Sequence, residues 1–332
     1  MRQLFGIICL ILVCFTLKAQ ETESLIRDTK HYRFQINYWL NMHHLLWTEA
    51  FLNEHLDSTI IDKELNDKEQ EALDAALNYY RENLIQEDLS GGAYMTPFRV
   101  WIINQQEQIR QTPTQFQAHM KILSGFYSTY YQHFWPEHSR ACKQVIRRNL
   151  ELVKSTEEAF VEQITTLTRQ PWQSGQIRVD VTFLGKISKR NLRGRPYTNL
   201  LPTHIVMNAP KDIGVDGTWL ELLYVESARQ LIRRNANFVS GTIQDVAEIN
   251  KLEAPKPLWQ AYLYFFAGKV TQDLLTQQGL EYPQIYMQRR GNFARYYTLL
   301  DNHLSPYLKR EVTLSEVTLS LLQELAESKQ ND

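Results

Sequence analysis

The chain has 332 residues, of which 43% are hydrophobic, and its 36 basic and 37 acidic residues give a formal charge of −1. This composition supports one or two buried cores and excludes a disordered or fibrous protein. The balanced charge also argues against a general nucleic-acid-binding protein. The basic stretch "KISKRNLRGRPYTN", residues 186–199, is a local exception. We interpret it as a solvated loop or hairpin, with contact to an anionic ligand as the alternative.

The chain begins "MRQLFGIICLILVCFTLKAQ", with an apolar run over residues 4–17. That run is shorter than the roughly 20 residues needed to cross a bilayer. We therefore predict a secretory signal peptide over residues 1–19, cleaved near Ala19. Lipid attachment through Cys14 is less favoured, because Val13 stands where a small residue is preferred. The mature protein is expected to be periplasmic or extracellular, with no membrane span.

Cleavage would leave Cys142 as the single cysteine of the mature chain. An intramolecular disulfide and a cysteine zinc cluster are then excluded. We interpret Cys142 as a small residue that packs between helices rather than a nucleophile. Loss of Arg2 and Lys18 leaves 34 basic and 37 acidic residues, a formal charge of about −3.

Residues 20–170 are predicted to form a helical N-terminal region. Apolar residues recur there at helical spacing, as in "FQINYWLNMHHLLWTEAFLNEHL" and "KEQEALDAALNYYRENL". Breaks are expected at "SGGAYMTP", "RQTPTQ" and "FWPEHS", which all contain glycine or proline. No internal repeat or low-complexity tract is present.

Residues 171–332 begin with a strand pattern, because Ile177, Val179, Val181 and Phe183 alternate with other residues. A second strand is expected at "THIVMN", and the basic stretch between the two forms a hairpin or a long connection. Helices are expected at "LELLYVESARQLI" with Asp216 or Thr218 as N-cap, at "PLWQAYLYFFAGKVTQDLLTQQG", at "FARYYTLLDNHL" and at "TLSEVTLSLLQELAES". The expected fold is α+β and predominantly α-helical, with a small β-sheet between helical halves.

The helix "LELLYVESARQLI", residues 220–232, has the outline of a zinc-peptidase helix with Glu226 in place. In such enzymes two histidines four residues apart bind zinc, and a glutamate after the first one activates the bound water. The chain resembles a family of secreted bacterial zincin-like proteins of gluzincin type in the order of its motifs from "HFWPEH" to "FAGKV". A weaker resemblance is present at "NYWLNMHHLLWTEAF". The parallels are Ile177–Val181, Pro196–Thr198, Thr203–Val206, Trp219–Arg229, and Trp259 with Gln260. The resemblance implies a zincin-like fold that forms one compact unit.

The positions of the metal ligands differ from the pattern of that family. Val225 and Arg229 stand where the two histidines are expected, and Gln260 stands at the histidine of the later helix. Lys269, beside Gly268, replaces an expected acidic residue. Valine cannot bind a metal, guanidinium repels a dication and an amide is a poor zinc ligand, so the resemblance implies no metal and no cofactor at this site. An ordinary amphipathic helix with a polar arc is the alternative interpretation.

Arg229 lies three residues beyond Glu226, within reach of its side chain on a helix. We therefore hypothesise that Arg229 neutralises a vestigial catalytic glutamate. The cleft implied by the resemblance would be lined by Val225, Arg229, Gln260, His204, Tyr197 and Arg233. Its cations would favour an anionic group such as a peptide carboxylate.

Other histidines could form a relocated metal site. His43 and His44 are adjacent and should face different sides of a helix, whereas His133 and His138 flank a predicted turn at Trp135. Neither pair has a recognised ligand spacing. His204 would border the cleft, although a hydrogen-bonded structural histidine is the simpler interpretation.

Three functions remain open from the sequence. The favoured one is a non-catalytic binding or scaffolding module in the cell envelope, whose partner could be a peptide or an envelope protein and not a nucleic acid. The second is a peptidase-like hydrolase that uses Glu226 with shifted ligands or with no metal. The third is a purely structural envelope protein, because a fold does not determine a function.

Overall fold

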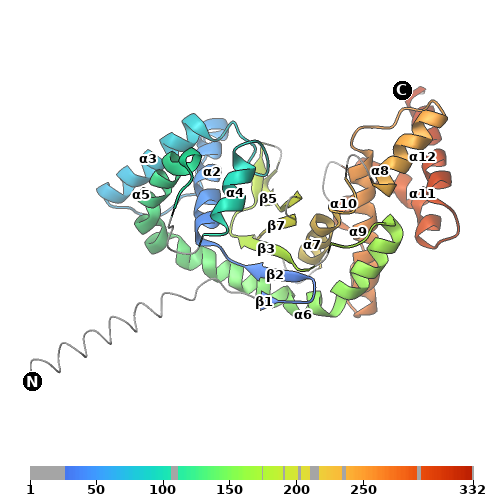
Figure 1. Ribbon diagram of the computed structural model, residues 1–332, viewed down its shortest axis with the longest axis horizontal. Coiled ribbons are helices and arrows are strands. Elements are labelled where there is room, and N and C mark those ends of the chain that lie inside the picture. The colour runs from blue at the N-terminus through green and yellow to red at the C-terminus, as the bar shows by residue number, and fades with distance from the viewer. Residues whose placement is uncertain are drawn as a thin grey trace, which may run out of the picture.

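A computed structural model describes residues 27–105, 111–173, 175–189, 191–200, 203–209, 217–233, 237–289 and 293–330. The predicted signal peptide, with Cys14 and Ala19, and the predicted cap Asp216 lie outside these residues. Helices dominate the described chain, and a small sheet lies between two groups of helices (Figure 1). The predicted α+β, predominantly helical class is confirmed. None of the described helices is both long and apolar enough to cross a membrane.

The N-terminal helices follow the predicted periodicity and end near the predicted breaks. Asn37 caps the first of them by accepting from the main chain of Leu40, and Asn66 forms a capping box with Glu69. The helices are α2 (Tyr38–Leu56), α3 (Asp67–Asn83), α4 (Met95–Ile102), α5 (Gln117–His133) and α6 (Trp135–Thr168), with a short 3-10 turn, η1 (Thr114–Phe116), before α5.

The predicted turn at "FWPEHS" is instead a junction between two helices. Phe134 keeps helical dihedral angles between α5 and α6, and Pro136 lies in the first turn of α6. Proline is tolerated there because the first N–H groups of a helix have no partner within the helix. His133 therefore ends α5, and His138 lies inside α6.

The sheet joins strands from the N-terminal end of the described chain with strands from its middle, in the order β1-β2-β3-β7-β6. Strands β2, β3 and β7 are parallel, whereas β1 and β6 pair antiparallel at the two edges. Most of the basic stretch lies in a separate antiparallel pair of strands, β4 and β5, which agrees with the predicted hairpin, whereas its last three residues belong to β6. The strands are β1 (Arg27–Asp28), β2 (Tyr32–Gln35), β3 (Ile177–Thr182), β6 (Tyr197–Leu200) and β7 (Thr203–Asn208), and the hairpin is β4 (Lys186–Ser188) with β5 (Asn191–Arg195).

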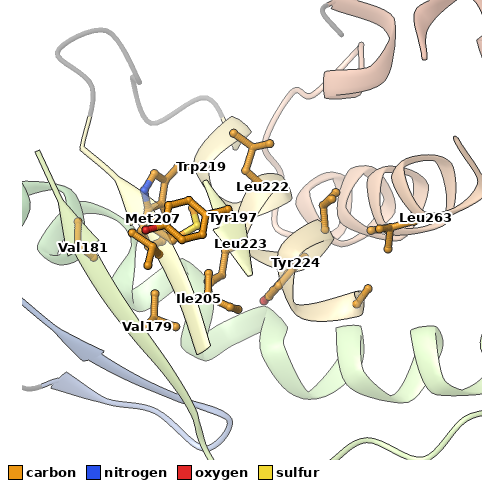
Figure 2. Close-up of a cluster of buried hydrophobic side chains, with 14 of the residues drawn as sticks. Val179, Val181, Tyr197, Ile205, Met207, Trp219, Leu222, Leu223, Tyr224 and Leu263 are labelled. Carbon is orange, nitrogen blue, oxygen red and sulfur yellow. The ribbon is translucent and has the colours of Figure 1, made fainter. Parts of the chain in front are cut away.

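The two faces of the sheet differ in chemistry although both are covered. Figure 2 shows Val179, Val181, Ile205 and Met207 on the apolar face, which packs against α7. The opposite face carries the alternate residues, among them Asp180, and it is covered by α2 and α4. Because strand residues alternate between faces, this polar layer is as deeply buried as the apolar one.

The C-terminal helices include the four that were predicted, at α7, α9, α11 and α12, and two that were not, α8 and the single-turn α10. Helix α8 was missed, although Phe238, Val239 and Ile243 have helical spacing and Asn237 caps it. The predicted cap Thr218 is wrong, because Gly217 is the N-cap of α7 and Thr218 is its first residue. The helices are α7 (Thr218–Ala228), α8 (Phe238–Ile249), α9 (Leu258–Gln277), α10 (Tyr286–Arg289), α11 (Tyr297–Leu308) and α12 (Leu314–Gln330), with a 3-10 turn, η2 (Ala294–Tyr296), before α11.

Candidate functional site

Helix α7, which carries Glu226, lies inside the protein. Every residue from Trp219 to Ala228 is buried, because β6 and β7 cover one side of the helix and α9 covers another. Figure 2 shows Trp219, Leu223 and Tyr224 of this helix beside the apolar face of the sheet. Any polar group on α7 must therefore find its partners within the protein.

Glu226 has such partners at both carboxylate oxygens. Arg229 donates from Nε to Oε2 at 2.6 Å and from Nη2 to Oε1 at 3.0 Å. Thr198 on β6 donates from Oγ1 to Oε2 at 2.7 Å. The side chain of Glu226 is only 1% exposed, so these charge-assisted bonds replace its hydration. The hypothesised pair of Glu226 and Arg229 is confirmed.

Arg229 also contacts α9, through Tyr264. Its Nη2 lies 3.4 Å from the Tyr264 hydroxyl, and its guanidinium lies 5.8 Å from the centre of that ring. Burial alone would lower the pKa of Arg229, but Glu226 and Tyr264 raise it above its ordinary value. Burial raises the pKa of Tyr264 to about 12. The cluster therefore consists of one carboxylate, one permanent cation and two neutral hydroxyl groups.

The remaining predicted residues of this region, on α7, on α9 and just after α7, differ in their exposure. Val225 is fully buried in the hydrophobic core. Gln260 lies in the first turn of α9, one turn before Tyr264, and is partly exposed. Arg233 is exposed, and its Nε donates to the main-chain oxygen of Gln230 at 3.1 Å.

Tyr197, although next to Thr198 in sequence, belongs to the polar face of the sheet. Its hydroxyl lies 2.8 Å from Nε2 of His44, whose Nδ1 lies 2.8 Å from the carbonyl oxygen of Leu184. Because a carbonyl can only accept, Nδ1 of His44 carries the proton and Tyr197 donates to Nε2. Burial lowers the pKa of His44 to about 3, which keeps the imidazole neutral.

His204 is held by a buried carboxylate on the neighbouring strand. Its Nε2 lies 2.8 Å from Oδ2 of Asp180, which also accepts from Nε of Arg178 at 2.6 Å. Burial would raise the pKa of Asp180, but His204 and Arg178 lower it overall. Burial lowers the pKa of His204, so the neutral imidazole donates from Nε2. A carboxylate that orients an imidazole occurs in catalytic sites, but His204 is only 1% exposed.

Arg99 completes this polar layer and was not identified from the sequence. Its guanidinium donates to the main-chain oxygen atoms of Leu89 at 2.6 Å and Ser90 at 3.0 Å, and to Oδ1 of Asn199. It also lies 4.7 Å from the centre of the Tyr197 ring. An arginine in an amphipathic helix normally faces solvent, so nothing in the sequence indicates that Arg99 is 1% exposed.

Glu221, one and a half turns before Glu226, is a second buried acid that the sequence reasoning missed. It accepts from the main-chain nitrogen of Tyr286 at 2.7 Å and from the hydroxyl of Tyr282. It also explains Gly268, where a Cβ atom would lie 2.8 Å from Oε1 of Glu221. Lys269 points elsewhere and pairs with Asp301 at 2.9 Å.

The other candidate histidines make ordinary structural contacts. His43 lies 2.8 Å from the hydroxyl of Tyr80, so it and His44 do contact different partners. His133 lies 2.9 Å from Glu69, and His138 lies 2.9 Å from Tyr130. Within the described ranges, no three or more His, Cys, Asp or Glu side chains are grouped so that they could hold a metal ion.

Cys142 is fully buried, as expected for a helix-packing residue, and burial raises the pKa of its thiol.

Comparisons of the chain with models of protein families, with curated proteins and with solved structures found no match. What can be inferred about function therefore rests on the geometry of the site.

Proposed function

We propose that this protein is an exported, zincin-like protein without catalytic activity that acts as a binding or scaffolding module in the cell envelope. The observation that carries this proposal is that the carboxylate of Glu226 is buried and hydrogen-bonded within the protein. Both of its oxygens accept hydrogen bonds from Arg229 and Thr198, and the carboxylate is almost completely buried.

A glutamate that activates water needs an accessible oxygen to accept the proton. Freeing Glu226 would leave both its carboxylate and the guanidinium of Arg229 without a partner in a buried place, which is unfavourable.

Glu157 offers a comparison within the same chain. It is also buried, and it holds the loop before β2 by accepting from Thr29 Oγ1 at 2.6 Å and from the main chain of Lys30 at 2.9 Å. Glu226 similarly links α7 to β6.

The ligand class follows from the charged groups around the cluster. Arg229 and Gln260 are partly exposed, and Arg233 is exposed. Arg229 is already paired with Glu226, so the exposed Arg233 is the cation that can receive a ligand. Guanidinium groups bind carboxylates in a bidentate manner, and a peptide carboxylate is therefore the ligand that we propose for this surface. A hydrolase that uses Glu226 is less well supported, because it would require the pair with Arg229 to open.

Thermal unfolding with a panel of short peptides and glycans tests the binding proposal. A ligand that binds the folded state raises Tm, and the increase grows with the logarithm of the ligand concentration above Kd. We expect peptides with a free carboxylate to raise the Tm of the native protein, and to raise that of Arg233→Gln less. Lys121→Gln, which removes an exposed cation from α5, should respond like the native chain. If no peptide or glycan raises Tm, a purely structural role is favoured.

Export is tested separately by cell fractionation and mass spectrometry of the N-terminus. The proposal expects a mature chain that begins near Gln20, outside the cytoplasm. A full-length chain in the cytoplasm would contradict it, and a lipid on Cys14 would favour the anchored alternative.

A further inference from the structure

A second surface, on α5 and α6, has the properties of a binding groove. It encloses about 720 Å³ between the end of α5 and the first turns of α6. Among the residues that the structure describes, those that line the groove include four cations, Arg140, Lys143, Arg147 and Arg148, and no acid. None of these residues takes part in the cluster around Glu226.

The four cations form a stripe along one side of α6. Positions 140, 143 and 147 recur at spacings of three and four residues, which bring side chains to the same helix face, and Arg148 follows directly after them. The stripe spans on the order of 12 Å along the helix axis at 1.5 Å per residue. A ligand that matches it must carry at least two negative charges spread over a similar length.

Two acids close to the stripe in sequence pair with lysines outside it. Glu137 pairs with Lys63 at 3.1 Å, and Glu151 pairs with Lys154 at 2.8 Å. Arg140, Arg147 and Arg148 are exposed. The groove is therefore a region of positive potential on a chain whose mature formal charge is about −3.

One end of the groove is aromatic. Tyr131 is 41% exposed, and Trp135 forms part of the floor. Tyrosine and tryptophan provide contact area for an apolar side chain at a low cost in conformational entropy. The groove thus combines an apolar end with a cationic stripe.

We propose that this groove binds an acidic, extended peptide segment of a partner protein, with at least two carboxylates next to an apolar side chain. The carboxylates would pair with Arg140, Arg147 and Arg148, and the apolar side chain would lie on Tyr131. A narrow chain can enter a hollow, whereas a flat lipid surface reaches basic residues on a convex face. This inference goes beyond the function proposed above and uses a different surface.

Fluorescence anisotropy with two labelled peptides tests the proposal. One peptide contains three Glu-Glu-Leu repeats, and its control contains three Gln-Gln-Leu repeats. We expect the glutamate peptide to bind the mature protein and to lose affinity steeply as salt is raised, because salt screens exposed charges. The glutamine peptide should bind at least about tenfold more weakly.

Matched variants locate the site. The double variant Arg140→Gln with Arg147→Gln should lose about tenfold or more in affinity for the glutamate peptide. Lys68→Gln with Lys121→Gln removes the same charge from exposed positions on α3 and α5 and should bind normally. All four changes are on exposed helical positions, where glutamine is a good helix former.

A fluorophore in the groove provides a second measurement. Gln144→Cys places a thiol among the lining residues, and Cys142 is buried, so the new thiol is the one that a dye modifies. Addition of the glutamate peptide should change the fluorescence of this dye, and the glutamine peptide should not.

Four results would overturn the proposal. The glutamate peptide could fail to bind, or both peptides could bind equally well. The groove and control variants could lose affinity equally, or the peptide could bind without changing the fluorescence of the dye at residue 144. Binding of phosphatidylglycerol vesicles that depends on Arg140 and Arg147, without binding of the peptide, would assign the groove to a membrane and also overturn it. None of these results bears on Glu226.

Discussion

Arg229 reaches back across one turn of helix and donates two hydrogen bonds to Glu226, at 2.6 and 3.0 Å. In the zincin-like relationship that we propose, this pair occupies the positions of a metal ligand and of the glutamate that activates water. Thr198 adds a third bond from the edge strand β6. The carboxylate therefore stabilises the contact between α7 and the sheet, and we infer that this is its role.

Replacing Arg229 by methionine should lower the free energy of unfolding by about 3 kcal/mol, because the Glu226 carboxylate loses its cation in a buried place. Urea denaturation measures the change. A double variant with Glu226→Gln should regain most of the loss, since no unpaired charge is left. Arg233→Met is the control and should change stability by less than about 0.5 kcal/mol, because Arg233 is exposed. Equal effects at Arg229 and Arg233 would show that the pair contributes nothing.

Removal of the Tyr197 hydroxyl should leave Nε2 of His44 without its hydrogen-bond donor. Tyr197→Phe is therefore expected to cost about 1–3 kcal/mol, the usual range for a buried polar group without a partner. Tyr131→Phe removes a hydroxyl from a side chain that is 41% exposed and should be nearly neutral. Similar stability of the two variants in urea would contradict the proposed donor role of Tyr197.

A methyl group at Gly268 should destabilise the contact between α7 and α9. Its Cβ would lie 2.8 Å from Oε1 of Glu221 and 2.9 Å from Cδ1 of Ile285, so Gly268→Ala should cost about 1–3 kcal/mol. Gly125→Ala is a matched control inside α5, where nothing lies within 4 Å of the new atom. That variant should gain about 0.5–1 kcal/mol, because alanine favours helix. A stabilising Gly268→Ala would refute the account of this contact.

Stability should fall as pH is lowered from 7 towards 4. Burial lowers the pKa of His44, His119 and His138 to about 3, whereas an unfolded histidine titrates near 6.5. Between those values the unfolded chain binds protons that the folded chain does not, so acid favours unfolding. The three groups together contribute a slope of up to about 4 kcal/mol per pH unit.

Urea denaturation at several pH values between 5 and 7 measures this slope. His138→Phe should reduce it by about 1.4 kcal/mol per pH unit, because one titrating group is removed. The loss of stability deepens near pH 4 and below, where protonation of Asp180, whose pKa is lowered in the folded state, removes its contribution. A free energy of unfolding that is the same at pH 5 and pH 7 would contradict the buried, neutral state of these histidines.

Much of the helical part of the fold could be predicted from the sequence, because long amphipathic segments and their caps are local signals. Strands β1, β2 and β6 could not. They have 2, 4 and 4 residues, too few for an alternating pattern to be distinctive. Their pairing depends on contacts over long sequence distances, such as that of Tyr32 with Ile177.

The candidate site was predictable only where its residues are close in sequence. Glu226 and Arg229 are three residues apart on one helix, so helical geometry alone indicated their pairing. Thr198 and Tyr264 join them through tertiary contacts that no local pattern reports. The same reason explains why Arg99 was missed, since its partner Asn199 lies 100 residues away.

The most direct test of the central claim is a metal and activity measurement on the purified mature protein and its Glu226→Gln variant. The account predicts no stoichiometric zinc in either protein, and no peptidase activity that depends on Glu226. Stoichiometric zinc in the native protein, lost together with peptidase activity in Glu226→Gln, would contradict it.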